Sequence, residues 1–483
     1  MVNYECVRCG YETTQRQKYD RHVASRTNPC SDKYSLLLKT MLSLKDEVVA
    51  IQQQLTTVQG ALQRHGLERN VLTVTTVPTS PKSLDPLRPA RGLTFIDLFC
   101  GIGGFHQALT SLGARCVLAC DIDAKCREVY EDNYGIKPAE DVTKLDTATM
   151  PDFDILVGGF PCQAFSHSGK QEGFEDTRGT LFRDCARILK DKQPRFFLME
   201  NVKNLTGHDD GRTWATIYRS FTEVGYKTYE HPLVLSPHQL GVPQHRERVL
   251  IMGIRNDIAP AVLPPIEPLS PPPCSIQSIL LDDAEIPVGT ALTADDTAIL
   301  NLWETFVQHF KQRDIKLPTF PLWSEDWDGT ASVDNEPDWK AKFLRQNRAF
   351  YTEHVGFLGP WLLQARSVAK FVGAKSKFEW QAGAFQEGDS LWTLLFQFRP
   401  SGIRVKRATY SPALVALAQI VYVGEKRRKL CPREVARLQS FPDTFKLPAT
   451  ASVAYKQFGN SVNVEVIKFA MRHILTKMIS PSS

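Results

Sequence analysis

The sequence predicts an α/β protein with a doubly wound, mostly parallel sheet and a smaller second domain. Short apolar segments alternate with amphipathic helical segments from Leu93 to about residue 255, which is the pattern of βαβ units. Glycines and acids follow several of the apolar segments, at the strand ends where open sheets place ligands. Residues 256–429 lose this rhythm, which indicates a separate region.

The elements follow from the apolar pattern in chain order. Strands are expected over 93–99, 114–123, 153–160 and 194–201, with helices over 105–113 and 124–135 between them. A further short strand is expected to end at Asp141. No period can be assigned over 256–429, and the tryptophan-bearing stretch 320–339 is expected to be a loop. A helix over 462–478 closes the chain.

Composition limits the class of protein. The chain has 483 residues and a net charge of +5, a balance too small to indicate a nucleic-acid partner by itself. Eleven cysteines, an odd number without a secretory leader, predict reduced intracellular thiols or metal ligands. No apolar run approaches the 18 residues of a membrane span. We therefore expect an intracellular protein that does not enter a membrane.

Composition also divides the chain into six regions. Residues 1–32 are polar, 33–69 are rich in leucine and glutamine, and 70–92 form a Thr/Ser/Pro-rich linker. Residues 93–255 form the main domain, 256–429 the irregular region, and 430–483 a segment that returns to the main domain.

The first region carries a metal-ligand pattern. Cys6 and Cys9 are followed by His22 and Cys30, a spacing that resembles a C2H2-type finger whose last ligand is cysteine. This pattern predicts a structural Zn2+ site. The alternative interpretation is four unrelated residues in a polar tail.

The second region carries a heptad pattern. Its apolar residues are spaced alternately four and three apart over 37–62, the seam of a coiled coil: Leu37, Met41, Leu44, Val48, Ile51, Leu55, Val58 and Leu62. The pattern predicts a homo-oligomer through this helix. An amphipathic helix packed on the main domain is the alternative.

A glycine-rich turn follows the first strand of the main domain. In "FIDLFCGIGGF" (95–105), glycines allow a ligand to approach the backbone closely. Asp121 comes at the end of the second strand and Asp141 at the end of the expected third, where acids can contact a ribose or an adenine edge. A nucleoside cofactor is therefore predicted, with helix-capping acids as the alternative.

A single thiol marks the next strand end. "GGFPCQAFSHSG" (158–169) places Cys162 where a strand gives way to a loop. Glu200 follows another expected parallel strand, and Arg246 and Arg248 lie in "GVPQHRERVLIMG" (241–253). A thiol near an acid and guanidinium groups suits nucleophilic attack on an electron-poor ring.

Six segments in this order resemble the motifs of DNA (cytosine-5) methyltransferases. They are "FIDLFCGIGGF", "GGFPCQAFSHSGKQEGFEDTRGTLF", "MENV", "QHRERV", "RLQSFPDTF" and "QFGNSV". The resemblance covers about residues 93–478 and implies a Rossmann-like, class I S-adenosylmethionine-dependent fold. It also makes 256–429 the target-recognition region.

The resemblance implies the catalytic roles. The thiolate of Cys162 would add to carbon 6 of a cytosine flipped out of double-stranded DNA, and Glu200 would support ring nitrogen 3. Arg248, with Arg246 beside it, would hold the exocyclic oxygen. Carbon 5 would then take the methyl group of S-adenosyl-L-methionine.

The resemblance also implies the binding residues. Those carried over for the cofactor are Phe99, Gly101, Ile102, Gly104, Asp121, Ile122, Asp141, Leu181, Asn460 and Ser461. Those expected to contact DNA are Gln163, Ser166, Ser168, Arg404, Lys406 and Arg407. The basic run 425–434 is also expected to meet phosphates.

Two other functions stay open at this point. One is an RNA (tRNA) cytosine-5 methyltransferase, and the other is a zinc-finger DNA-binding regulator with an inactive methylase fold. The sequence leaves open a cognate restriction endonuclease as partner, a solitary role and a viral role. A bacterial protein of this kind would act on DNA in the cytoplasm.

Overall fold

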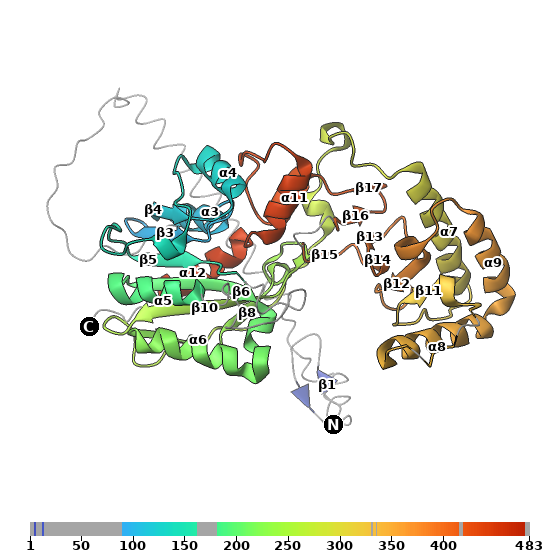
Figure 1. The fold of residues 1–483 in the computed structure, drawn as a ribbon, viewed down its shortest axis with the longest axis horizontal. Coiled ribbons are helices and arrows are strands. Elements are labelled where there is room, and N and C mark those ends of the chain that lie inside the picture. The colour runs from blue at the N-terminus through green and yellow to red at the C-terminus, as the bar shows by residue number, and fades with distance from the viewer. Residues whose placement is uncertain are drawn as a thin grey trace, which may run out of the picture. The chain divides into compact units, whose positions relative to one another are not determined.

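The computed structural model describes residues 89–161, 181–329, 332–334, 336–414 and 419–478, together with two short N-terminal strands (Figure 1). The chain divides into two compact units, Met1–Lys82 and Ser83–Ser483. In the first unit, β1 (Tyr4–Glu5) pairs antiparallel with β2 (Glu12–Thr13). The four predicted zinc ligands and the heptads of 37–62 lie outside the described residues.

A seven-stranded sheet forms the centre of the second unit, in the order β4-β3-β5-β6-β10-β7 with β8 also paired to β10. The first four of these strands run parallel, and β10 is antiparallel to each of its neighbours. The strands are β3 (Thr94–Leu98), β4 (Arg115–Cys120), β5 (Ile155–Gly158), β6 (Phe196–Val202), β7 (Tyr226–Thr228), β8 (Leu233–Leu235) and β10 (Arg248–Arg255). The structure therefore confirms a mixed α/β sheet in which β4, β3, β5 and β6 are parallel.

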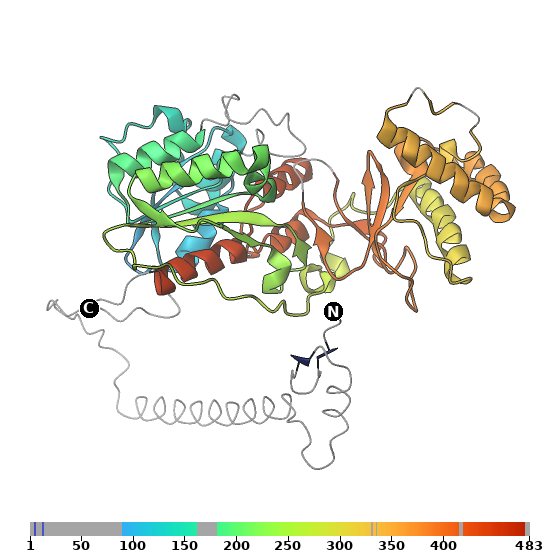
Figure 2. The same ribbon diagram turned by 90° about the horizontal axis from the view of Figure 1, so that it is seen from below.

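Helices cover both faces of this sheet (Figure 2). One face packs on α3 (Gly104–Ser111), α4 (Ala124–Tyr134) and α12 (Val464–Lys477), and the other on α5 (Leu181–Lys192) and α6 (Arg212–Glu223). Successive strand residues alternate between the two: Phe95 lies in the α3/α12 core, and Ile96 lies in the α5/α6 core. Buried on both faces, these strands are continuous apolar runs, as parallel strands normally are.

The expected third strand is absent, so that prediction was wrong. Only Ala139 makes a parallel bridge, to Cys120. Asp141 instead caps the 3-10 turn Val142–Lys144, and its carboxylate accepts from the backbone N–H of Thr143 at 3.0 Å. An aspartate side chain that bonds the backbone two residues on favours a turn over a strand.

The order β4-β3-β5 creates a switch point in the sheet. After β3 the chain crosses to β4 on one side, and it later returns to β5 on the other side. The loops that follow β3 and β5 therefore diverge from the carboxyl ends of two adjacent parallel strands. This is the position where open α/β sheets bind ligands.

Residues between 292 and about 406 form a smaller lobe with its own core, and residues 422–429 add two strands to its sheet. Its helices are α7 (Ala294–Lys311), α8 (Asp338–Glu353) and α9 (Val355–Ser367). Its six-stranded sheet has the order β11-β12-β14-β13-β16-β17, formed by β11 (Leu322–Trp323), β12 (Lys377–Trp380), β13 (Leu395–Arg399), β14 (Gly402–Lys406), β16 (Tyr422–Val423) and β17 (Arg428–Lys429). Stretch 320–339, expected as a loop, contributes Leu322 and the fully buried Trp327 to this core.

Residues 258–280 belong to the main core, because Ile276 and Ile279 pack there. The chain returns to that core through α10 (Pro432–Leu438) and α11 (Ala451–Asn460), and β15 (Ser411–Pro412) pairs in parallel with β9 (Gln244–His245). No helix in the described ranges has the length and apolar character that crossing a bilayer requires.

Candidate active site

The glycine turn after β3 is held in a left-handed backbone conformation. Phe99, Gly101 and Gly103 have φ values of 53°, 52° and 87°, and this region is costly for any residue with a side chain. The amide of Gly101 donates to Asp121 Oδ2 at 2.7 Å, and Asp121 Oδ1 accepts from the amide of Asp123 at 2.8 Å. Burial raises the pKa of Asp121, and these two backbone hydrogen bonds oppose the rise.

Close packing beneath the turn leaves no room for side chains. A Cβ on Gly103 would lie 2.2 Å from Cε2 of Tyr134, and one on Gly104 would lie 2.6 Å from Cγ2 of Val462. Tyr134 also donates its hydroxyl to the carbonyl of Gly103 at 3.0 Å. The sequence analysis did not name Tyr134. Its position on the helix that follows Asp121 could have indicated that it packs near the glycine turn.

The other predicted cofactor residues occupy different environments. Ile122 is 80% exposed at the end of β4, whereas Ile102 is buried under the turn. Ser461 comes directly after α11 and approaches the turn, since its Oγ would lie 2.9 Å from a Cβ on Gly104. Leu181 begins α5, and Asn460 ends α11 with an exposed side chain.

Asp141 is held close to Asp121 by the backbone. The amide of Asp121 donates to the carbonyl of Ala139 at 3.0 Å, two residues before Asp141. A hydrogen bond from the Thr143 side chain lowers the pKa of Asp141, so this acid is ionised at neutral pH.

An acid and a guanidinium meet across β6 and β10. Glu200 pairs in register with Leu250, two residues from Arg248, so both side chains point to the same face. Arg248 Nε donates to Glu200 Oε1 at 3.0 Å. Burial raises the pKa of Glu200, and the charges of Arg248 and Arg246 oppose that rise. A small pocket opens here, lined by Glu200, Pro237, Arg246, Arg248, Val462, Asn463, Val466 and Ile467.

Arg246 is directed differently from Arg248. Its side chain is 4% exposed, and its guanidinium donates to the carbonyls of Leu414 at 2.6 Å, Gly459 at 3.0 Å and Ser461 at 3.1 Å. The expected contact with the exocyclic oxygen of a base therefore fits Arg248 better, and Arg246 joins the C-terminal segment to the wall of the pocket.

The chain that leads to the predicted nucleophile runs beside Glu200. β5 pairs in parallel with β6, so Gly158 lies opposite Met199. A Cβ placed on Gly159 would lie 3.5 Å from Glu200 Oε2. The buried Asn201 donates to the carbonyl of Phe160 at 3.2 Å. Asn201 was not predicted as a site residue, although it lies inside the "MENV" motif.

Four predicted residues cannot be placed. Cys162, Gln163, Ser166 and Ser168 lie outside the described residues, and Pro161 is the last one described before them. Asn201 nevertheless fixes the backbone two residues before Cys162. The structure thus brings Glu200, Arg248 and the start of the cysteine loop to one place.

The predicted DNA-contacting cations of the lobe differ in their surroundings. Arg407 donates to the Asp389 carboxylate and to the carbonyls of Ala382 at 2.8 Å and Ala384 at 2.6 Å. Among the described residues, Arg404 has one hydrogen-bond partner, Glu379, at 2.8 Å. The protein's own backbone and a carboxylate thus hold Arg407, and its expected contact with DNA stays a prediction.

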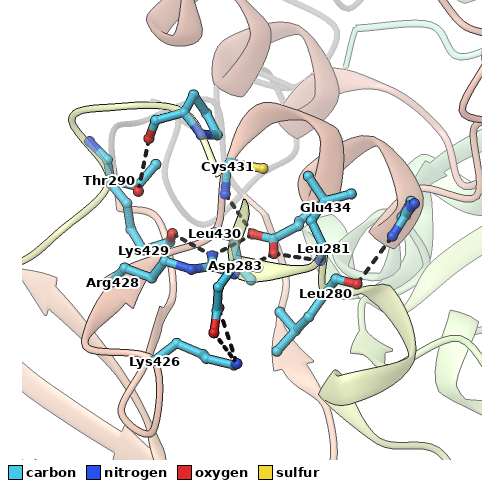
Figure 3. Close-up of polar contacts among 12 residues, drawn as sticks. Leu280, Leu281, Asp283, Thr290, Lys426, Arg428, Lys429, Leu430, Cys431 and Glu434 are labelled. Carbon is cyan, nitrogen blue, oxygen red and sulfur yellow. Dashed lines mark hydrogen bonds and ion pairs between the residues drawn. The ribbon is translucent and has the colours of Figure 1, made fainter. Parts of the chain in front are cut away.

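Much of the basic run 425–434 also folds onto the protein, as Figure 3 shows. Arg428 forms a buried two-point ion pair with Glu434, at 2.8 and 2.7 Å. Glu434 accepts in addition from the amides of Leu281 and Cys431, and Lys426 pairs with Asp283. The expectation that this run meets phosphates was therefore wrong for Arg428, because the carboxylate of Glu434, six residues later in the same run, pairs with it in the interior.

A doubly wound sheet with its polar site at the switch point defines a ligand-binding α/β protein of the open-sheet class. Among the described residues no group of His, Cys, Asp or Glu is arranged to hold a metal. The chain belongs to the C-5 cytosine-specific DNA methylase family, whose sequence profile matches residues 93–476. The reaction is accordingly the transfer of a methyl group to carbon 5 of cytosine in DNA.

Curated relatives agree with this assignment. The chain is 31% identical to Type II methyltransferase M.AluI of Cellulosimicrobium cellulans, over 78% of this chain and 91% of the relative. It is 35% identical to Type II methyltransferase M.HhaI of Haemophilus parahaemolyticus, over 79% of this chain and 94% of the relative. Type II methyltransferase M.HpaII of Haemophilus parainfluenzae is 33% identical, over 80% and 90% of the two chains.

Proposed function

We propose that the chain uses S-adenosyl-L-methionine to methylate a flipped-out cytosine within a specific duplex sequence, through a covalent adduct on Cys162. The Glu200–Arg248 pair, in a pocket beside the backbone that leads to Cys162, is the observation that carries the proposal. A base inside a duplex cannot reach such a pocket without leaving the stack.

The residues of the pocket act on the ring in sequence. The thiolate of Cys162 bonds to carbon 6, and Glu200 gives a proton or hydrogen bond to nitrogen 3 as negative charge develops there. The raised pKa of Glu200 favours the protonated acid that this donation requires. Arg248 holds Glu200 and faces the exocyclic oxygen. Once carbon 5 carries the methyl group, a base must take its remaining proton, and the electrons of that C–H bond then expel the thiolate of Cys162 from carbon 6.

The residues around the glycine turn fit the cofactor. The turn excludes side chains at Gly103 and Gly104, Asp121 presents a carboxylate at the next strand end, and exposed Ile122 offers an apolar surface. Such a surface suits an adenine and such a carboxylate suits a ribose. S-adenosylmethionine, when bound, supplies an electrophilic methyl group on sulfur. Phe99, Gly101, Asp141, Leu181, Asn460 and Ser461 complete the proposed binding set.

Bisulfite sequencing of DNA from cells that express the chain tests the proposal. We expect protected cytosines within one short motif, and no protection with Cys162→Ala. Protection that persists in Cys162→Ala, or none with the wild-type chain, would contradict it. Methylation of tRNA instead of duplex DNA would favour the RNA alternative, which the family match does not support. Tight sequence-specific binding without turnover would favour the inactive regulator.

The biological setting belongs to the proposal too. The relatives are Type II methyltransferases by name, and this supports a role in restriction-modification with a cognate endonuclease. We expect the host DNA to resist cleavage by that endonuclease when the chain is expressed.

For the N-terminal unit we propose a structural zinc held by Cys6, Cys9, His22 and Cys30. The strands β1 and β2 bracket the two-cysteine segment, as in a zinc knuckle. The purified chain should carry one equivalent of zinc, and the double variant Cys6→Ser/Cys9→Ser should carry none. Self-association through 37–62 predicts an oligomer by light scattering that becomes a monomer when Leu44 and Ile51 are changed to lysine.

A further inference from the structure

The sheet of the lobe has an apolar face, which packs in the lobe's core, and an opposite face that carries most of its polar side chains. Phe378, Phe396, Ile403 and Val405 belong to the lobe's aromatic core, together with residues of α7 and α9. The residues that alternate with them on β12, β14 and β13 must point to the opposite face. Those residues are Lys377, Glu379, Gln397, Arg399, Arg404 and Lys406, together with Gly402 and the buried Leu395.

Arg404 is oriented on this face by a single contact. Its Nε donates to Glu379 Oε2 at 2.8 Å, and Glu379 is itself engaged by the side chain of Gln381. Within the described part of the chain, Nη1 and Nη2 of Arg404 have no hydrogen-bond partner. A guanidinium that is fixed through Nε presents its two Nη donors as a pair.

The face carries more positive charge than the protein itself balances. Glu379 is the one acid on these three strands, against Lys377, Arg399, Arg404 and Lys406. Burial and the charge of Arg404 lower the pKa of both Arg399 and Lys406. In the described residues, the buried Nε of Arg399 also lacks a partner. A ligand with acceptors and negative charge would relieve this crowding.

Arg407 provides the contrast within the same sheet. It directly follows β14 and donates to Asp389 and two backbone carbonyls, so it stabilises the lobe from within. The cations that remain as candidates for a ligand contact are thus Arg399, Arg404 and Lys406.

We propose that Arg404, oriented by Glu379, reads a guanine in the target sequence through its major-groove acceptors O6 and N7, while Arg399 and Lys406 contact neighbouring phosphates. A paired donor edge of arginine matches these two acceptors in the commonest base-specific contact known in DNA recognition. Phosphate contacts hold the register without reading sequence. This inference rests on the proposed function of the chain as a sequence-specific DNA methyltransferase.

The test measures methylation by the full-length protein on a duplex library with randomised flanks of cytosine, read by bisulfite sequencing. The wild-type chain should define a motif that contains guanine. Arg404→Gln should lose the preference for one of these guanines by roughly 10- to 100-fold, and Glu379→Gln should weaken the same preference. Arg399→Gln and Lys406→Gln should reduce affinity for all sequences and lower the salt slope by about 1 each.

A control and a chemical probe separate recognition from folding. Arg366→Gln removes another arginine of the same lobe, which forms a two-point ion pair with Asp328, and it should keep the full motif. Replacing the guanine that Arg404 reads with 7-deazaguanine should slow the wild-type chain but leave Arg404→Gln unchanged.

The outcomes distinguish the two proposals. If the wild-type chain methylates a motif but 7-deazaguanine has no effect at any of its guanines, or if Arg404→Gln keeps the full motif, the reading role of Arg404 is wrong. The probe decides this point even if Arg404→Gln does not fold. If the wild-type chain methylates no sequence, the proposed function fails and this inference fails with it.

Discussion

Glu200 combines burial with a guanidinium neighbour, and the balance between the two determines its chemistry. Burial alone would favour the neutral acid, whereas the 3.0 Å contact with Arg248 favours the carboxylate. A group near this balance can pass a proton to a base and take it back. Next to Glu200, the side chain of Asn201 donates to the carbonyl of Phe160 and so holds the backbone that leads to Cys162.

Replacing Glu200 by glutamine should lower kcat strongly. The amide keeps the shape of the acid but cannot supply a proton, and loss of one such stabilising group typically costs about 10²–10³-fold in kcat. Single-turnover methylation of duplex DNA would measure this loss. The matched control is Glu247→Gln, which removes a more exposed partner of Lys203 and should leave kcat unchanged. A Glu200→Gln enzyme with normal kcat would contradict the role.

Asp97 should make folding stability depend on pH. Burial and the charge of Asp121 raise its pKa well above the usual value, so the folded state binds a proton that the unfolded state releases above about pH 4. Stability from this group is therefore full below pH 4 and is lost as the pH rises toward the folded pKa, by about 1.4 kcal/mol per pH unit.

His106 acts in the opposite direction, because burial lowers its pKa to about 4 and the unfolded state takes the proton first. Comparing urea denaturation of the wild type and Asp97→Asn across pH isolates the Asp97 effect. The free energy of unfolding should fall less steeply with pH in the variant. Parallel curves would contradict a protonated Asp97.

At the scale of elements, the glycine turn depends on α4 beneath it. Gly103→Ala should destabilise the protein and weaken cofactor binding, since a Cβ would combine left-handed strain with a 2.2 Å contact to Tyr134. Gly135→Ala has similar strain, at φ 67°, but meets nothing within 4 Å.

Calorimetric titration with S-adenosylmethionine and chemical denaturation would compare the two variants. Gly135→Ala should lower the free energy of unfolding by about 1–2 kcal/mol, the cost of a left-handed backbone conformation for alanine. It should keep the cofactor affinity. Equal losses in both variants would show that contact with Tyr134 does not matter.

The apolar pattern predicted the elements of the main sheet well, because each strand from Thr94 to Val202 is buried on both faces. It failed where local chemistry dominates, as at Asp141, whose side chain starts a turn. It also failed in the lobe, where α9 contains Pro360 and so looks unlike a helix. Helix α7 could have been found, since Thr293 caps it and Ile299, Trp303, Phe306 and Phe310 share one face.

The candidate site was predictable by motif but not by geometry. Glu200 and Arg248 were named from sequence, and their contact follows from the antiparallel pairing of β6 and β10. The different directions of Arg246 and Arg248 could not be predicted, because the carbonyl partners of Arg246 come from residues more than 150 positions later. The burial of Arg428 was missed for another reason: Glu434 is only six residues away, but the sequence does not show that the two side chains meet in the interior.

At the scale of the whole molecule, the Arg428–Glu434 pair should be a major source of stability. Both side chains are almost fully buried, and breaking such a pair by removing one partner typically costs about 3–5 kcal/mol. Glu434→Gln should therefore lower the free energy of unfolding by about this amount in urea denaturation.

Asp443→Asn is the matched control, because it removes the partner of Arg437 in a pair whose acid is 57% exposed. Its cost should stay below about 1 kcal/mol. Similar costs for the two variants would show that the buried pair has no special weight, and the link between β17 and α10 would then depend on apolar packing.

The carbonyl partners of Arg246 have a consequence for which parts of the chain the pocket requires. Gly459 and Ser461 lie more than 200 residues after Arg246, and Val462 and Ile467 line the same pocket. A chain cut between Arg246 and Gly459 would keep Glu200 and Arg248 but would lose one wall of their pocket. Neither of the two pieces can therefore form the pocket by itself.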